Sequence, residues 1–353
     1  MDFSPLKELL DALTISRLPC ADVRVMRKGQ LLFEYTVGLS DVENELPLQS
    51  DARFCAYSLT KLLTSACTLC ALEEGLLTLD TKLCELMPEF STMQVLDEDT
   101  TGRHLRPARE KITIRQLLTM SAGFGADMRL LAPGDTQAAV RALAKQPLLF
   151  EPGTRWLYGL CYEVLGAALE RVYGMRLRDV FRLKIYEKAG MHNSCFLSEV
   201  RDLSGLTPLC RVCEDSYVPM AFDMTYAPNA VYDSGGAGLV TSAQDYIRFL
   251  DALQGGRIVS KASFSQMCAR SINDIQQRDF NWPQMKGYSY GLGLRVPLAG
   301  SGLSDVGWGG AAGPYALMEP ASGVSMCFFT SVLGTDEVYL YSSLRDALKR
   351  CTL

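Results

Sequence analysis

Arg53-Phe-Cys-Ala-Tyr-Ser58-Leu-Thr-Lys61-Leu-Leu-Thr-Ser-Ala-Cys-Thr-Leu-Cys-Ala-Leu-Glu-Glu-Gly75 is the stretch that decides the fold. Its apolar residues recur at helical spacing from Ser58 to Glu74, and Gly75 stands where a C-terminal cap is expected. Ser58 is the natural N-cap or first-turn residue of this helix. Because residues three apart share a helix face, the Lys61 amine can reach the Ser58 hydroxyl. The stretch therefore predicts a serine nucleophile beside its base.

The spacing alone is a weak signal, because Ser4-Pro5-Leu6-Lys7 in the same chain has it too. The surroundings separate the two pairs. Lys61 leads into an apolar helix, where burial favours the neutral amine that can accept a proton. Lys7 stands in a predicted terminal helix over 5–13, where it is a solvated charge. Ser58 and Lys61 are therefore the preferred pair.

Both ends of the chain carry strand signals. The runs 22–27 and 30–37 are rich in β-forming residues, and Lys28-Gly29 between them predicts a tight hairpin turn. Near the other end, strand-like runs occupy 288–296, 315–318 and 324–330, before a helix over 338–349. We expect the terminal segments to share one sheet. The middle of the chain is mainly helical, which predicts an α/β lobe with an inserted helical lobe and a ligand site at their seam.

Composition limits the possible partners. The chain has 353 residues, 48% of them hydrophobic and 21% charged, with a formal net charge of -5. No basic stripe is present, so nucleic acid is not an expected partner. No apolar run reaches the roughly 18 residues that span a bilayer, so a membrane anchor is not expected either. An acidic N-terminal segment without an export signal, together with 12 scattered cysteines, predicts a cytoplasmic protein.

Two other kinds of site were weighed. Cys-x-x-Cys pairs at 67–70 and 210–213 could form a four-thiolate zinc site, but the first lies in an apolar helical run and is better interpreted as core. The histidines, His104 and His192, stand in polar stretches, and no Gly-x-Ser-x-Gly elbow occurs. A Ser-His-Asp triad and a metal centre are therefore not expected, and no cofactor is needed.

The chain resembles the β-lactamase-related serine hydrolases over most of its length. Five further blocks after the Ser58 stretch occur in the family's order and spacing: Leu72-Glu-Glu-Gly-Leu-Leu-Thr-Leu-Asp, Ile112-Thr-Ile-Arg-Gln-Leu-Leu-Thr-Met-Ser-Ala-Gly-Phe, Glu151-Pro-Gly-Thr-Arg-Trp-Leu-Tyr, Ser234-Gly-Gly-Ala-Gly-Leu-Val-Thr-Ser-Ala-Gln-Asp-Tyr and Gly307-Trp-Gly-Gly-Ala-Ala-Gly. The resemblance implies a β-lactamase/transpeptidase-like fold of the α/β (α+β) class. Its antiparallel sheet would be flanked by the N- and C-terminal helices, with an inserted, mainly α-helical lobe. We place the α/β lobe at about 1–57 and 287–353 and the helical lobe at about 58–286, in one domain over 1–353.

The same resemblance assigns the second catalytic motif to Tyr158, in preference to Tyr162 four residues on. Beside Lys61 the phenolate of Tyr158 would be stabilised, so the two would act as a coupled pair that takes the Ser58 proton and returns one to the leaving group. The motif departs from penicillin-recognising members, because Tyr158-Gly159-Leu160 lacks their asparagine.

The third motif departs as well. Trp308-Gly309-Gly310 replaces the lysine or histidine that holds a substrate carboxylate in penicillin-binding enzymes, and it resembles the family's esterases and lovastatin-type acyltransferases. The glycines let a carbonyl approach the backbone, so an amide at Gly310 or Ala311 would form an oxyanion hole with that of Ser58. Trp308 and Gly309, with Trp282 or Tyr288, would shape a mainly apolar acyl pocket.

The sequence thus predicts a serine hydrolase that acts on a small-molecule ester, as a carboxylesterase or acyltransferase, through an acyl-enzyme on Ser58. The alternatives are a β-lactamase or D,D-peptidase-like activity and a non-catalytic binding protein on the same fold. The acyl group, the alcohol and the choice between monomer and homodimer are not specified by the sequence.

Overall fold

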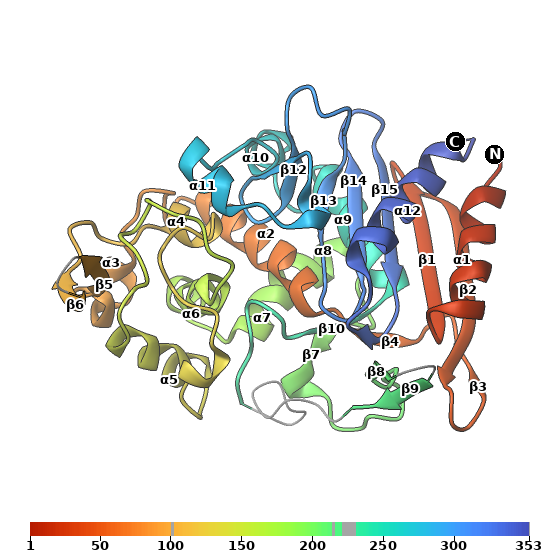
Figure 1. The fold of residues 1–353 in the computed structure, drawn as a ribbon, viewed down its shortest axis with the longest axis horizontal. Helices are drawn as coiled ribbons and strands as arrows, with labels where there is room; N and C mark the ends of the chain where they lie inside the picture. The colour runs from red at the N-terminus through yellow and green to blue at the C-terminus, as the bar shows by residue number, and fades with distance from the viewer. Residues whose placement is uncertain (100–101, 214–215, 221–230, 353) are drawn as a thin grey trace.

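An eight-stranded antiparallel sheet joins the two ends of the chain (Figure 1). The structure is a computed structural model that describes residues 1–99, 102–213, 216–220 and 231–352. The order of strands is β11-β12-β13-β14-β15-β1-β2-β3. Their bounds are β1 Cys20–Arg27, β2 Gln30–Asp41, β3 Leu46–Pro47, β11 Tyr288–Tyr290, β12 Arg295–Pro297, β13 Val306–Gly309, β14 Tyr315–Glu319 and β15 Val324–Phe329.

The predicted pairing of the two ends occurs between β1 and β15, whose register runs from Asp22 opposite Phe329 to Arg27 opposite Val324. The predicted hairpin joins β1 to β2. Its two turn residues lie at φ 50° (Lys28) and 85° (Gly29), and positive φ at both central residues fits a turn of the right twist for a hairpin. The expected fold class is confirmed.

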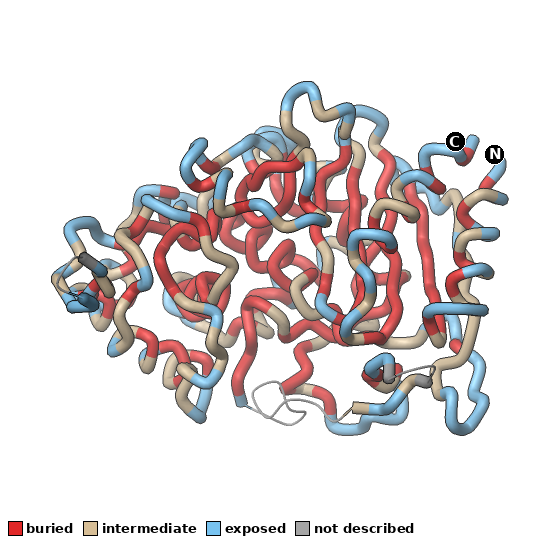
Figure 2. Tube along the Cα trace, viewed as in Figure 1, coloured by how far each residue is buried: buried red, intermediate tan, exposed pale blue. Residues whose placement is uncertain are grey.

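Three helices cover this sheet. On one face lie α1 (Ser4–Ser16) and α12 (Glu337–Arg350), whose leucines pack with Val23, Val25 and Phe328. On the other lies α9 (Ala243–Gln254), against β1 and β15. Successive residues of a strand point to opposite faces, so both faces bury apolar side chains and the sheet is buried throughout its middle (Figure 2).

Most of the remaining helices lie to one side of the sheet, on the left in Figure 1. The remaining α-helices are α2 Thr60–Glu73, α3 Leu83–Leu86, α4 Ile114–Leu118, α5 Thr136–Arg141, α6 Cys161–Tyr173, α7 Leu177–Phe181, α8 Glu187–Ala189, α10 Lys261–Met267 and α11 Asp274–Asp279. Short 3-10 helices occupy Tyr57–Leu59, Pro88–Phe90, Met128–Leu130, Ala142–Lys145, Leu197–Glu199 and Pro283–Met285, and a π-helix occupies Arg182–Tyr186. Most of the helices thus lie within 58–286, and α9 in this span packs on the sheet, while the expected division into two lobes stays a prediction.

Small sheets complete the fold. The strands β4 (Arg53–Cys55), β10 (Leu239–Ser242) and β7 (Cys195–Phe196) form one of them, next to the start of α2. The others join β16 (Val332–Leu333) to β8 (Cys210–Cys213) and β9 (Ser216–Pro219), and β5 (Gln94–Asp99) to β6 (Gly102–Pro107). Among the described helices the longest, α2 and α12, have 14 residues each, and none is long and apolar enough to cross a bilayer.

A buried ion pair supports strand β13. Arg295, 1% exposed, donates from Nη2 to Oδ2 of Asp305 at 2.6 Å and to the Tyr315 hydroxyl at 2.6 Å. The Tyr288 hydroxyl donates to the other oxygen of Asp305 at 2.5 Å. Burial acts to raise the pKa of Asp305, but the charge of Arg295 and the hydrogen bonds from Tyr288 and Arg295 together hold that pKa below its usual value.

Replacing Asp305 with alanine is expected to lower the free energy of unfolding by about 3 kcal/mol, because the guanidinium of Arg295 would stay buried without a counter-charge. Urea denaturation followed by circular dichroism measures the change. Asp80→Ala is the matched control, since Asp80 is 77% exposed and its ion pair with Arg115 lies at the surface. Equal losses in the two variants would contradict a structural role for the buried pair.

Candidate active site

Ser58 lies in a short 3-10 turn between β4 and α2. The turn is anchored by β4, which pairs with β10, and by the Ala56 amide, which donates to the Leu239 carbonyl at 2.9 Å. Tyr57, just before the serine, has φ 45°. This left-handed conformation costs a residue with a side chain roughly 1–2 kcal/mol. The chain thus turns sharply at Tyr57 and leaves Ser58 partly exposed at the start of a buried helix.

Lys61 lies one turn further on and is 6% exposed. Its Nζ donates to Oγ of Ser58 at 3.1 Å and to the carbonyl of Gly236 at 2.7 Å. The same nitrogen lies 4.8 Å from the ring centroid of Tyr158. The predicted association of Ser58, Lys61 and Tyr158 is therefore present in the folded chain.

Tyr158 and Tyr162 have different surroundings. The Tyr158 hydroxyl faces the cavity at Ser58 and accepts from Nε1 of Trp308 at 3.3 Å. The Tyr162 hydroxyl is buried, where it donates to the Leu118 carbonyl at 3.1 Å and lies 2.8 Å from Oγ of Ser65. Burial raises the pKa of Tyr162. This geometry supports the choice of Tyr158. Among the described contacts, no hydrogen bond yet joins the Tyr158 hydroxyl to Ser58 or Lys61, and catalytic contacts often tighten only when substrate binds.

A cavity of about 360 Å³ opens at Ser58. Its lining combines four aromatic residues with the glycine-rich end of β13 and one acidic side chain: Ser58, Tyr158, Trp282, Pro283, Gln284, Met285, Trp308, Gly309, Gly310, Ala311, Glu337 and Tyr341. A larger hollow of about 640 Å³ lies between α1, α12 and β9, but no serine paired with a lysine is among its described lining residues. The smaller cavity is therefore the candidate active site.

The aromatic walls include two of the three residues expected there. Trp308 and Trp282 both line the cavity, with ring centroids 5.7 and 5.0 Å from that of Tyr158. The prediction was wrong for Tyr288, which is 1% exposed and bonded to Asp305 behind the wall. A strand places alternate residues on opposite faces, and the sequence did not show which face Tyr288 takes.

The glycines of β13 permit a close approach to the nucleophile. A Cβ on Gly310 would lie 2.6 Å from the carbonyl oxygen of Ala56, two residues before Ser58, and one on Gly309 would lie 2.5 Å from the Tyr341 hydroxyl oxygen. Any larger residue would push the strand and the serine turn apart.

The amides at this strand end are not equivalent. The Gly310 amide donates to the Pro314 carbonyl at 2.8 Å, so the expectation that it serves an oxyanion hole was wrong. The alternative, Ala311, lines the cavity, and no hydrogen bond among described residues uses its amide. The Ser58 amide stands at the start of its helical turn, where amides lack intrahelical partners. Of the amides expected in an oxyanion hole, those of Ser58 and Ala311 are thus the two that remain candidates.

The other residues weighed from the sequence lie elsewhere. His104 and His192 are exposed, and neither lines the cavity. Cys67 and Cys70 are buried in α2, where burial raises the pKa of both thiols. These two cysteines pack in the core, as their position in an apolar helix predicted. Cys210 is buried in β8, and its partner Cys213 ends that strand.

The sequence analysis missed Glu163 of α6. This carboxyl group is 3% exposed and accepts from Oγ of Ser234 at 2.9 Å and from the Tyr232 hydroxyl. Burial raises the pKa of Glu163, while its hydrogen bonds and the nearby Lys61 act in the opposite direction. Tyr232 and Ser234 belong to the segment that ends in Gly236, the carbonyl partner of Lys61. An acidic residue within the apolar run 161–169 of α6 was the available signal.

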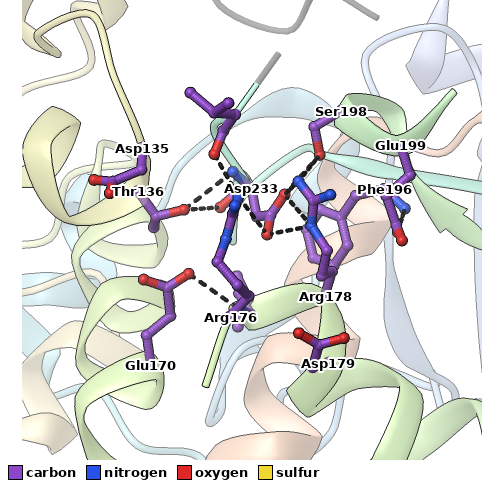
Figure 3. A network of polar contacts seen from close by, with 12 residues as sticks. Asp135, Thr136, Glu170, Arg176, Arg178, Asp179, Phe196, Ser198, Glu199 and Asp233 are labelled. Carbon is purple, nitrogen blue, oxygen red and sulfur yellow. Dashed lines mark hydrogen bonds and ion pairs between the residues drawn. The ribbon is translucent and has the colours of Figure 1, made fainter. Parts of the chain in front are cut away.

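A second contact set holds the same segment at its other side (Figure 3). Asp233 is fully buried and accepts from Nε of Arg178 at 2.8 Å and from Nη2 of Arg176 at 3.1 Å. Oγ of Ser198 donates to it at 2.6 Å, and its own amide donates to Oγ1 of Thr136 at 3.0 Å. With Glu163, this network fixes the backbone whose Gly236 carbonyl accepts from Nζ of Lys61.

Known proteins are similar to this chain in sequence and in fold. Esterase EstB of Burkholderia gladioli is 27% identical over 361 residues, which cover 91% of this chain and 88% of EstB. Monacolin J acid methylbutanoyltransferase of Aspergillus terreus is 29% identical over 230 residues, 60% of this chain and 55% of the transferase. The solved structure of EstCE1, a hydrolase with promiscuous acyltransferase activity, matches with a TM-score of 0.84 at 22% identity, covering 98% and 97% of the two chains.

The fold and the paired serine and lysine define a serine hydrolase. Residues 6–349 match the family model described as Beta-lactamase, and the chain belongs to the β-lactamase family.

Gly310→Ala is expected to lower kcat/KM for 4-nitrophenyl butanoate by at least about 100-fold, because the new methyl group would displace the Ala56 carbonyl and the serine turn that follows it. Initial-rate kinetics measure the effect. Gly300→Ala tests for a general glycine effect, because a Cβ there meets nothing within 4 Å, although its φ of 77° makes some loss of stability expected. Full activity in Gly310→Ala would contradict the close-approach argument.

Glu163→Ala is expected to lower kcat about 100-fold with little change in KM, because Glu163 positions the Lys61 acceptor and does not line the cavity. Glu163→Gln keeps one acceptor oxygen and should lose about tenfold. Glu170→Gln is the matched control, since Glu170 is buried on the same helix but accepts from Gln137 and Leu177. If Glu170→Gln and Glu163→Gln reduced kcat equally, a general packing effect would replace the positioning role.

Proposed function

We propose that this serine hydrolase cleaves small-molecule esters through an acyl-enzyme on Ser58. The observation that carries the proposal is the buried Lys61 Nζ, 3.1 Å from Oγ of Ser58, at a cavity with aromatic walls. Ser58 loses its proton to the coupled pair of Lys61 and Tyr158 and forms a bond to the ester carbonyl carbon. The alcohol leaves with a proton returned by that pair.

The second half of the reaction frees the acyl group. Water or another alcohol loses a proton to the same pair, attacks the acyl carbonyl and restores Ser58, which gives hydrolysis or acyl transfer respectively. In both halves the amides of Ser58 and Ala311 hold the oxyanion. The names of EstB and of the methylbutanoyltransferase, an esterase and an acyltransferase, support both outcomes.

The cavity favours an apolar acyl group over a β-lactam. Trp308 occupies the place where penicillin-binding enzymes carry a cation for the substrate carboxylate, and its side chain forms a wall of the cavity. The structure therefore offers no observation that favours the β-lactamase alternative. We also propose a cytoplasmic location, which the eleven described cysteines support because all are free thiols, a state typical of reducing compartments.

Labelling of Ser58 tests the proposal. Incubation with a fluorophosphonate is expected to add one adduct to the wild type, seen by intact-mass spectrometry and mapped to Ser58, and none to Ser58→Ala. The same substitution should lower kcat/KM for 4-nitrophenyl esters at least about 1,000-fold. Ser4→Ala is the matched control, because Ser4 also precedes a lysine by three residues but lies exposed on α1.

Other results would point elsewhere. Labelling that survives in Ser58→Ala would contradict the nucleophile, and an unlabelled, inactive wild type would favour a binding protein. Hydrolysis of nitrocefin faster than any ester would favour the β-lactamase alternative.

A further inference from the structure

Glu337 is the one acidic side chain among the described residues that line the Ser58 cavity. It stands in the first turn of α12, half-buried, and its Oε2 accepts from Nε2 of Gln284 at 2.9 Å. This hydrogen bond joins α12 to the 3-10 turn Pro283–Met285, whose residues also line the cavity. The carboxyl group is therefore held in place next to the space where substrate must lie.

This carboxyl group has no counter-charge within the part of the chain that the structure describes. Among the described residues no lysine, arginine or histidine forms an ion pair with it, and Gln284 is a neutral partner. Burial raises the pKa of Glu337, while the hydrogen bond from Gln284 and its place at a helix N-terminus favour the ionised form. A cation in the cavity would offset the burial.

The aromatic walls complete a site for such a cation. The rings of Tyr158 and Trp282 meet edge to face with an interplanar angle of 74°, while Trp308 stacks on Tyr158 with an interplanar angle of 29°. Rings set at an angle, with a carboxylate nearby, form the kind of cage that binds ammonium groups. Lys61 contacts the Tyr158 ring but is not among the cavity-lining residues.

We propose that the ester substrates carry a quaternary or tertiary ammonium group, bound between the aromatic walls and Glu337, and that esters carrying a carboxylate are excluded. The inference rests on the proposed ester hydrolysis at Ser58 and specifies its substrate class. Glu337 is then the residue that determines specificity.

Two matched substrate series test it. One varies the acyl side of 4-nitrophenyl esters, with 4-(trimethylammonio)butanoate, its uncharged isostere 5,5-dimethylhexanoate and a carboxylate-bearing hexanoate. The other varies the leaving group, with butanoylthiocholine, S-(3,3-dimethylbutyl) thiobutanoate and S-(3-carboxypropyl) thiobutanoate. In at least one series the wild type should prefer the cation over its isostere about tenfold in kcat/KM and reject the carboxylate.

Variants at position 337 should change that ratio. Glu337→Gln is expected to bring the ratio of kcat/KM between the cationic substrate and its uncharged isostere to within about twofold of unity. Glu337→Lys is expected to favour the carboxylate-bearing substrate. Glu8→Gln is the matched control, since it removes the same charge from an exposed position on α1 and should keep the wild-type ratio. Thermal unfolding midpoints verify that each variant is folded.

A binding measurement separates this proposal from the catalytic one. Trp156, Trp282 and Trp308 belong to one aromatic cluster at the cavity, so intrinsic fluorescence reports on its occupancy. Pentyltrimethylammonium should bind Ser58→Ala about tenfold more tightly than it binds Ser58→Ala carrying Glu337→Gln. Equal binding, or esters cleaved with no preference for the cation in either series, would overturn the substrate class while leaving ester hydrolysis intact. Failure of Ser58 labelling together with this preference in binding would instead indicate a binding protein for cations.

Discussion

A buried amine needs hydrogen-bond acceptors, and the need of Lys61 for them organises the site. Almost removed from water, its Nζ bonds to the Ser58 hydroxyl and the Gly236 carbonyl. Ser58 belongs to the turn just before α2, and Gly236 belongs to a segment more than 170 residues later. The site therefore forms only when the fold brings these two segments together. Glu163 and Asp233 hold that segment from two sides. The chemistry of one lysine therefore depends on packing between α2, α6 and the loop before β10.

The large sheet contributes to the site through the glycines at the end of β13. Because Gly309 and Gly310 lack side chains, the end of β13 can approach both Tyr341 and the Ala56 carbonyl. The ion pair of Arg295 and Asp305 braces the strand from behind. Tyr57, next to the end of β13, has an unfavourable backbone conformation that the pairing of β4 with β10 maintains. The position of Ser58 is thus set by two layers of the protein rather than by its own helix.

Local signals predicted much of this arrangement. The hairpin at Lys28-Gly29, the helix after Ser58 and the strands at both ends each carry their own periodicity or turn residues, and the serine and lysine lie on one helix. Tertiary placement was less visible. Periodicity gives the apolar face of α9 but not the layer on which it packs, and an aromatic residue such as Tyr288 suits either face of a strand. The hydrogen bond from the Gly310 amide and the role of Glu163 arise from contacts between distant segments.

The pairing of β1 with β15 also shapes how the chain must fold. The residues that pair are separated by about 300 positions, as between Asp22 and Phe329. At roughly 5–20 residues per second, a ribosome needs about 15–60 s to deliver β15 after β1 has emerged. During that time β1 and β2 form a hairpin with one open hydrogen-bonding edge and apolar faces, which is the surface that chaperones bind and aggregates recruit. Strand β1 is thus an interior strand of the folded sheet, but it is an exposed edge strand while the chain is being synthesised.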